Sequence, residues 1–164
     1  MAEAGDALTG GNVPPMPEVT VHTSIDIDAP PALVWAALAD LKAYPSWNPM
    51  IRRAEGELAR GSRLTLFFNP PGTKGTTFRP KLLVVEPVRE LRWQGQPGFP
   101  LFFESEHTFT IEPAPKGGCR LTHDMLFFGL LVPLVKRRIA RSVEGPFNLM
   151  NRALKERAEA AGRQ

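Results

Sequence analysis

A long apolar stripe near the C-terminus constrains the fold of this chain more than any other feature. From Pro133 onward, apolar side chains recur every three or four residues over about 28 residues, the spacing of one face of an α-helix. They are Val135, Ile139, Val143, Phe147, Met150, Leu154, Ala158 and Ala161. A helix of that length spans about 40 Å. Its apolar face must therefore be covered by the remainder of the chain.

Proline limits what can cover this helix. The chain has 17 Pro and 14 Gly among 164 residues, about twice the usual share of proline, and proline interrupts helices and central strands. A bundle of long helices is therefore excluded. Two prolines, Pro80 and Pro146, fall inside predicted elements. They predict an edge or bulge near Pro80 and a kink or brief interruption of the long helix near Pro146.

The rest of the sequence is typical of short strands. Residues 19–27 alternate between apolar and polar side chains and predict a half-buried strand. A helix to about Asp40 follows, with Asp28 as a capping candidate, and proline-rich residues 43–49 predict a turn or a single helical turn. Six further strands are predicted, separated by short turns that favour an antiparallel meander. They cover residues 50–55, 63–68, 78–86, 90–94, 102–112 and 119–128.

One antiparallel sheet curled around the C-terminal helix would bury the stripe. We therefore predict an α+β fold in which a seven-stranded antiparallel sheet wraps around a long C-terminal helix, with the helix and turn inserted between strands one and two. A chain of this length is expected to form a single domain.

Five short motifs resemble the START-like polyketide cyclase/dehydrase family of the SRPBCC superfamily. They are IDAPPALVW at 27–35, YPSWNP at 44–49, ELRW at 90–93, EHTF at 106–109 and NLMNRALK at 148–155. The resemblance implies a helix-grip fold with a cavity between sheet and long helix, and members of that superfamily bind or transform very different apolar molecules. It implies a START-like ligand-binding domain over residues 18–161, and residues 1–17, which have no apolar run, are expected to form a flexible tail.

Charge and cysteine content exclude other classes. The net charge of +3 comes with 23% charged and 43% hydrophobic residues, which are globular values. The basic residues of the C-terminal segment fit a solvated helix face, and no folded nucleic-acid motif accompanies them, so we expect no nucleic-acid partner. The single cysteine, Cys119, excludes an internal disulfide. Residues 1–17 do not look like a signal peptide, and the apolar run at 125–135 is too short to span a bilayer. We therefore expect a cytoplasmic protein.

Two histidines are predicted to face the interior. His107 shares a strand face with Phe103, Ser105, Phe109 and Ile111, and His123 shares one with Cys119, Leu121, Met125 and Phe127. Pairing Ile111 with Cys119 and Phe109 with Leu121 would place His107 opposite His123, about 5 Å apart at Cβ.

Three interpretations of this histidine pair are open. The two rings either form a satisfied structural pair that bonds Ser105, Thr23 or each other, or orient a ligand, or act as general acid and base. No inward carboxylate is visible to raise their basicity. A metal site is not expected, because Cys119 and His123 would lie about 13 Å apart along one strand.

The remaining cavity predictions concern aromatic and aliphatic side chains. Trp47 and Asn48 either contact a ligand at the cavity rim or only fix the turn. Leu130, Leu131 and Leu134 either pack in the core or form an apolar entrance flanked by Lys136, Arg137 and Arg138. The full predicted ligand-binding set is Trp47, Asn48, Leu66, Phe68, Leu91, Trp93, Phe103, His107, Phe109, His123, Met125, Phe127, Leu131 and Leu134.

Three functions are compatible with these features. Ten Phe and three Trp against one Tyr favour an apolar ligand, so the first is binding of a small apolar or amphipathic molecule such as a lipid, a polyketide-like aromatic or an isoprenoid. The second is a cofactor-free cyclase, aromatase or dehydrase that uses His107 or His123 as acid or base. The third is a protein that docks, in weak contact, on a membrane surface or on a partner. Nucleophile and phosphate-loop motifs are absent. We expect no cofactor.

Overall fold

The computed structural model describes residues 16–70, 72, 74–95, 104–115 and 117–163. The predicted tail, residues 1–17, lies outside this description except for its last two residues. The elements in chain order are β1 (Glu18–Ile27), α1 (Pro31–Ala39), a 3₁₀ turn (Leu41–Ala43), α2 (Tyr44–Trp47), β2 (Ile51–Glu55), β3 (Thr65–Phe68), β4 (Thr76–Phe78), β5 (Lys81–Glu86), β6 (Glu90–Gly95), β7 (Glu104–Pro113), β8 (Cys119–Phe128) and α3 (Val132–Gly162).

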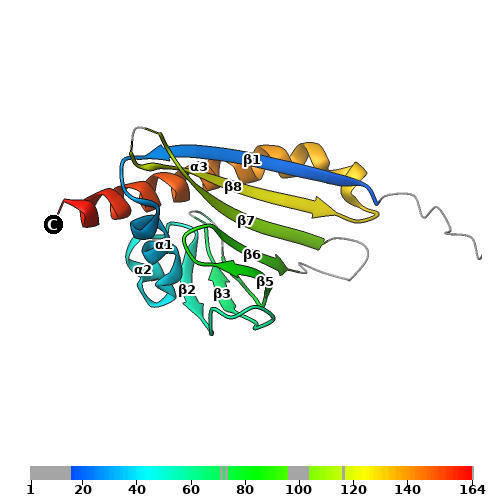
Figure 1. The fold of residues 1–164 in the computed structure, drawn as a ribbon. Helices are drawn as coiled ribbons and strands as arrows, with labels where there is room; N and C mark the ends of the chain where they lie inside the picture. The colour runs from blue at the N-terminus through cyan, green and yellow to red at the C-terminus, as the bar shows by residue number, and fades with distance from the viewer. Residues whose placement is uncertain (1–15, 71, 73, 96–103, 116, 164) are drawn as a thin grey trace, which may run out of the picture.

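Two antiparallel sheets and the long helix α3 form an α+β helix-grip fold (Figure 1). The larger sheet has the strand order β1-β8-β7-β6-β5, so the first strand of the chain pairs with the last. The smaller sheet has the order β2-β3-β4. Helix α3 runs alongside β1 and β8, and its C-terminal end lies beside α1 and α2 (Figure 1).

The predicted single sheet of seven strands is corrected to two sheets of five and three strands. The predicted strand 78–86 is divided at Pro80, which has no N–H to donate to a ladder. The carbonyl of Pro80 accepts from the Leu64 N–H at 3.0 Å, and the Leu82 N–H donates to the Ser62 carbonyl at 2.8 Å. The chain just before β3 therefore bonds to the start of β5, whereas β3 itself pairs with β2 and β4. The irregularity expected near Pro80 takes the form of this break, with a register shift between Leu82 and Val84.

Two predictions about the helices are also corrected. Helix α3 passes through Pro146 without a break in its helical assignment, so the predicted interruption is wrong, whereas a bend there stays a prediction. The N-cap of α1 is Pro30 and has no side-chain hydrogen bond, so Asp28 does not cap it. The Asp28 N–H donates instead to the Glu159 carboxylate at 2.8 Å, which ties the start of α1 to the end of α3.

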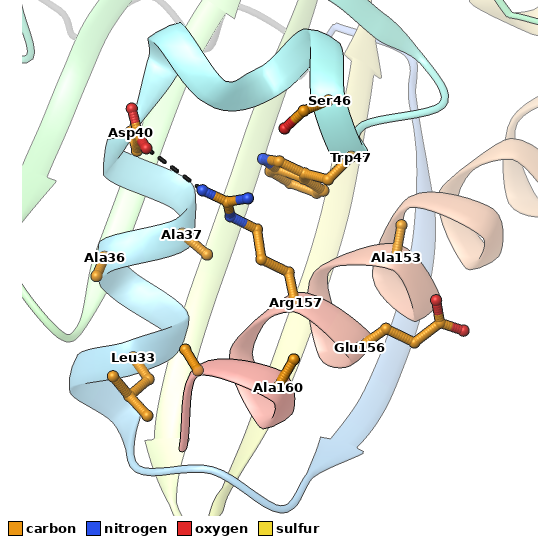
Figure 2. Close-up of a pocket in the computed structure, with 11 residues that line it drawn as sticks. Leu33, Ala36, Ala37, Asp40, Ser46, Trp47, Ala153, Glu156, Arg157 and Ala160 are labelled. Atoms are coloured by element: carbon orange, nitrogen blue, oxygen red, sulfur yellow. Dashed lines mark hydrogen bonds and ion pairs between the residues drawn. The ribbon is translucent and has the colours of Figure 1, made fainter. Parts of the chain in front are cut away.

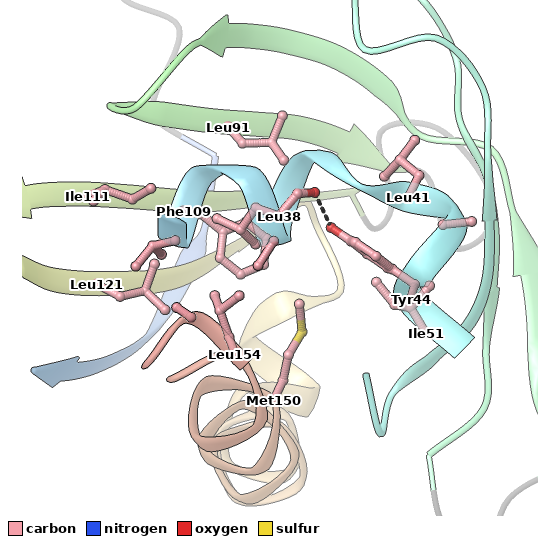
Figure 3. Packing of buried hydrophobic residues seen from close by; sticks show 14 of the residues in the cluster. Leu38, Leu41, Tyr44, Ile51, Leu91, Phe109, Ile111, Leu121, Met150 and Leu154 are labelled. Atoms are coloured by element: carbon pink, nitrogen blue, oxygen red, sulfur yellow. Dashed lines mark hydrogen bonds between the residues drawn. The ribbon is translucent and has the colours of Figure 1, made fainter. Parts of the chain in front are cut away.

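The main core lies between α3, α1 and the larger sheet (Figure 3). Met150 and Leu154 of α3 meet Phe109 and Leu121 of the sheet, and all four side chains are fully or almost fully buried. The single tyrosine, Tyr44, is equally buried, and its hydroxyl donates to the Leu38 carbonyl at 2.8 Å. Its hydroxyl therefore holds the turn after α1. Among the described residues, no helix is both long and apolar enough to cross a membrane.

Candidate functional site

An apolar cavity of about 650 Å³ lies between the two sheets and the first half of α3. Side chains from both sheets and from about two helical turns of α3 form its wall. The lining residues are Met50, Ile51, Leu66, Phe68, Pro70, Thr76, Phe78, Trp93, Gly95, Ser105, His107, Met125, Phe127, Ser142, Val143, Pro146 and Phe147. None of these described residues carries a formal charge at pH 7 when histidine is neutral. The wall is therefore suited to apolar surface rather than to ions.

Six of the predicted site residues line this cavity, namely Leu66, Phe68, Trp93, His107, Met125 and Phe127. His123 is fully buried and lies behind His107 rather than on the wall. Leu91 and Phe109 face the same interior but are fully buried against Leu38 of α1 (Figure 3). Phe103 lies outside the described residues. Sequence reasoning missed Phe147 and Val143 as wall residues, although both belong to the apolar stripe.

Trp47 and Asn48 do not line the cavity. The Asn48 side-chain oxygen accepts hydrogen bonds from the backbone N–H groups of Met50 and Ile51, both at 2.9 Å. Of the two predicted roles of Asn48, this arrangement matches the one in which the side chain only fixes the turn. Leu131 and Leu134 do not line the cavity either, and they are exposed, so core packing is wrong for these two side chains.

Trp47 borders a second hollow, a groove of about 710 Å³ between α1, α2 and the end of α3 (Figure 2). Arg157 reaches across it to Asp40 with a nitrogen to oxygen distance of 3.4 Å. The indole Nε1 of Trp47 is buried and has no hydrogen-bond partner among the described residues. Because both ionic groups in this contact are partly exposed, the ion pair contributes little to stability.

The strand register beside the cavity differs from the prediction by two residues. Phe109 is opposite His123, and His107 is opposite Met125. The reason is that β7 continues to Pro113, which pairs with Cys119. Since strand faces alternate with a period of two, the shift leaves both histidines pointing inward.

The imidazole rings of His107 and His123 contact each other diagonally across the β7–β8 strand pair. Their Nε2 atoms are in hydrogen-bond contact, and the ring centroids lie 4.6 Å apart. His123 Nδ1 lies 2.8 Å from Asn151 Oδ1, Asn151 Nδ2 donates to Thr23 Oγ1 at 3.0 Å, and that hydroxyl donates to the His123 carbonyl at 2.9 Å. A network of buried polar side chains therefore crosses the core and links α3 to β1, β8 and β7.

These hydrogen bonds fix the tautomers of both imidazole rings. Because Asn151 Oδ1 can only accept, His123 carries its proton on Nδ1 and presents Nε2 as an acceptor. His107 must then donate from its own Nε2, which leaves its Nδ1 as a hydrogen-bond acceptor. His107 is the member of the pair that borders the cavity.

Burial keeps both rings neutral. Loss of hydration lowers the pKa of His107 well below 6.5, and the neighbouring His123 lowers it further. Burial lowers the pKa of His123 to about 3, although the hydrogen bond to Asn151 opposes the shift. Phe147 stacks on both rings, with centroid distances of 4.9 Å to His107 and 4.0 Å to His123, and Trp93 lies 4.8 Å from His107. These aromatic rings exclude the water that would stabilise an imidazolium.

Asn151 is the polar partner that sequence reasoning did not identify. It is almost fully buried and lies four residues after Phe147 and three before Leu154, on the apolar stripe itself. A polar residue at a core position of a helix is the signal that points to it. Within the described part of the chain, no group of three or more His, Cys, Asp or Glu side chains is arranged to hold a metal ion.

The fold and the cavity together define a class, the helix-grip proteins that enclose an apolar space between a sheet and a long C-terminal helix. The chain belongs to the family described as polyketide cyclase / dehydrase and lipid transport, which its residues 18–159 match. No curated protein sequence matches the chain.

Solved structures share the fold at low sequence identity. The di-domain aromatase/cyclase StfQ from the steffimycin biosynthetic pathway superposes with a TM-score of 0.74 at 12% identity, and the match covers 90% of this chain and 52% of that chain. The present chain thus spans about half the length of StfQ. The Zhui aromatase/cyclase from Streptomyces sp. R1128 gives 0.70 at 20% identity over 87% of this chain and 94% of that chain. Norcoclaurine synthase from Thalictrum flavum gives 0.70 at 18% identity over 90% and 98%.

Proposed function

We propose that residues 18–161 form a binding domain for a small apolar or amphipathic molecule, held in the cavity between the sheets and α3. The cavity itself carries this proposal. Its volume of about 650 Å³ falls in the range of small-molecule sites, which are mostly apolar and have a few polar groups that fix orientation. The family description, which includes lipid transport and polyketide chemistry, supports the same class of ligand.

The polar groups of the wall indicate what the buried part of the ligand carries. Ser105 and Thr76 offer hydroxyl groups, and His107 offers the acceptor nitrogen Nδ1. A ligand hydroxyl that donates to His107 would therefore be favoured over a ligand carboxylate, since no cationic side chain lines the described wall and an unpaired buried charge is costly. A charged headgroup on the ligand must remain outside the cavity.

A second candidate function is cofactor-free cyclisation or dehydration, with His107 as acid or base. The histidine pair on the cavity wall favours it, and two of the similar structures are named as aromatase/cyclases. The lowered pKa of His107 argues for hydrogen bonding over proton transfer, because a general base is most effective when its pKa lies near the working pH. Ligand orientation is therefore the better supported role.

Mass spectrometry of the organic extract of the purified protein, with displacement of the fluorescent probe N-phenyl-1-naphthylamine, tests the first proposal. Val143→Phe fills the α3 side of the cavity and should weaken probe binding at least tenfold. Val19→Phe is the matched control, because Val19 is also half-buried but does not line the cavity. Equal affinity in wild type and Val143→Phe would contradict cavity binding. A cyclase would convert a poly-β-ketone and lose turnover, but not probe binding, in His107→Phe.

A further inference from the structure

Exposed leucines surround the start of α3. Leu130, Leu131 and Leu134, here the leucine cluster, have exposed fractions of 55%, 44% and 81%. Large apolar side chains at such exposure within five consecutive residues are unusual on a soluble surface and indicate an interaction site. Their neighbour Val132 is buried, so the backbone that carries them is anchored in the fold.

Arginines follow the leucines along the same outer face of the helix. Arg137, Arg138 and Arg141, here the arginine cluster, lie three, four and seven residues after Leu134, which places all four on one side of α3. All three arginines are exposed and surround a recess of about 420 Å³ together with Ser142. The sequence from Gly129 to Val143 also holds Lys136 and has no acidic residue. This stretch of the chain therefore carries only positive charge.

The same helical turns form the wall of the cavity. Ser142 borders both the arginine recess and the cavity, and Val143 and Phe147 continue the cavity wall. The cationic surface and the proposed ligand site are thus the outer and inner sides of one stretch of α3.

We propose that this end of α3 docks on an anionic lipid bilayer, with the leucine cluster entering the interface and the arginine cluster against the lipid phosphates. Charge complementarity favours an anionic bilayer as the partner. Each guanidinium group can donate two hydrogen bonds to one phosphate group. Basic residues beside apolar ones are also attracted to anionic leaflets. Three leucines are also too small a patch for a stable protein interface, which buries about 800 Å² on each partner. Docking would bring the cavity wall to the source of an amphipathic ligand.

Vesicle co-sedimentation at low ionic strength tests the proposal. Wild-type protein should pellet with phosphatidylcholine vesicles that contain 30% phosphatidylserine, should not pellet with pure phosphatidylcholine, and should detach at high salt. Each basic residue strengthens binding about fivefold, so replacing the arginine cluster by glutamine should weaken it on the order of 100-fold. Leu131→Gln with Leu134→Gln should weaken binding at unchanged net charge.

The matched control replaces Arg53, Arg60 and Arg89 by glutamine, because these three are exposed on β2, the loop after it and the β5–β6 turn. It changes the net charge equally and should leave binding within about threefold of wild type. Equal losses in the two triple variants, or no sedimentation of wild type with anionic vesicles, would overturn the proposal. Self-association that depends on the leucine cluster, without vesicle binding, would overturn it in favour of a protein interface. Probe binding measured on the same variants tests the cavity separately, so either proposal can fail alone.

Discussion

Acidification from pH 7.5 to pH 5 should destabilise this protein through His107 and His123. Both rings are buried and neutral, with pKa values lowered below the ordinary 6.5. Below pH 6.5 the unfolded chain therefore binds two protons that the folded protein does not, and the free energy of unfolding falls as the pH falls. A histidine that stays neutral in the folded protein down to pH 5 removes about 2 kcal/mol at that pH, so two such rings remove about 4 kcal/mol.

The effect of these histidines on stability falls in a different pH range from that of the carboxylates. Asp26 and Glu159 have lowered pKa values because Arg120 and Lys155, respectively, bond to them. Such groups stabilise the folded state above their unfolded pKa, and their contribution is lost only as the pH falls below about 4. Between pH 7.5 and pH 5 the slope of stability therefore reports on buried histidine.

Urea unfolding at pH 7.5, 6.5, 5.5 and 5 measures this slope. The double variant His107→Phe/His123→Phe should lose most of it, whereas His22→Gln should retain it, because His22 is exposed and paired with Asp124 outside the core. In wild type, the ring carbon signals of His107 and His123 in NMR spectra should not titrate above pH 5.5. Titration of either ring near pH 6.5, or an unchanged slope in a folded double variant, would refute the assignment of two neutral buried rings.

Three further substitutions test the polar site and the part of the fold that supports it. Asn151→Asp should raise the pKa of His123, seen as an NMR titration that moves to higher pH, because a carboxylate on Nδ1 favours the imidazolium; no shift would show that the two groups are not in contact. Gly118→Ala should cost more stability in urea than Gly117→Ala, because both glycines have positive φ, but only a Cβ at 118 would collide with the backbone carbonyl at the end of β1. Leu154→Ala should cost about 3 to 5 kcal/mol in the same assay, since the side chain is fully buried, and a loss below about 1 kcal/mol would contradict its place in the core.

Local patterns predicted the faces of the strands but not their register. Alternation along β7 and β8 identified His107 and His123 as inward residues, and both are buried. The register depends on where the hairpin turn begins, and the run of small and turn-forming residues after Pro113 admits more than one turn. The extra pairing of Pro113 with Cys119 shifted every partner by two, an even number that preserves the faces and changes only the neighbours.

The network of buried polar side chains shows a second limit of prediction from the sequence. His123 and Thr23 lie on adjacent strands, and Asn151 comes from α3. Each is visible in the sequence as a polar residue at a core position. Which of them pair depends on how α3 sits on the sheet, and this rotation is set by the packing of the whole apolar stripe rather than by any one segment.

The boundary between core and cavity is the hardest feature to predict from sequence, and it decides the function. Leu91 and Trp93 lie on one face of β6, two residues apart, and their local patterns are alike. Both side chains belong to the buried cluster that includes Leu38 of α1, but only Trp93 also borders the cavity. None of the described cavity-lining residues belongs to α1, whose buried side chains lie in the main core instead. A larger side chain on the buried face of α1 should therefore change the stability of the core, whereas one at Val143 should change the space left for a ligand.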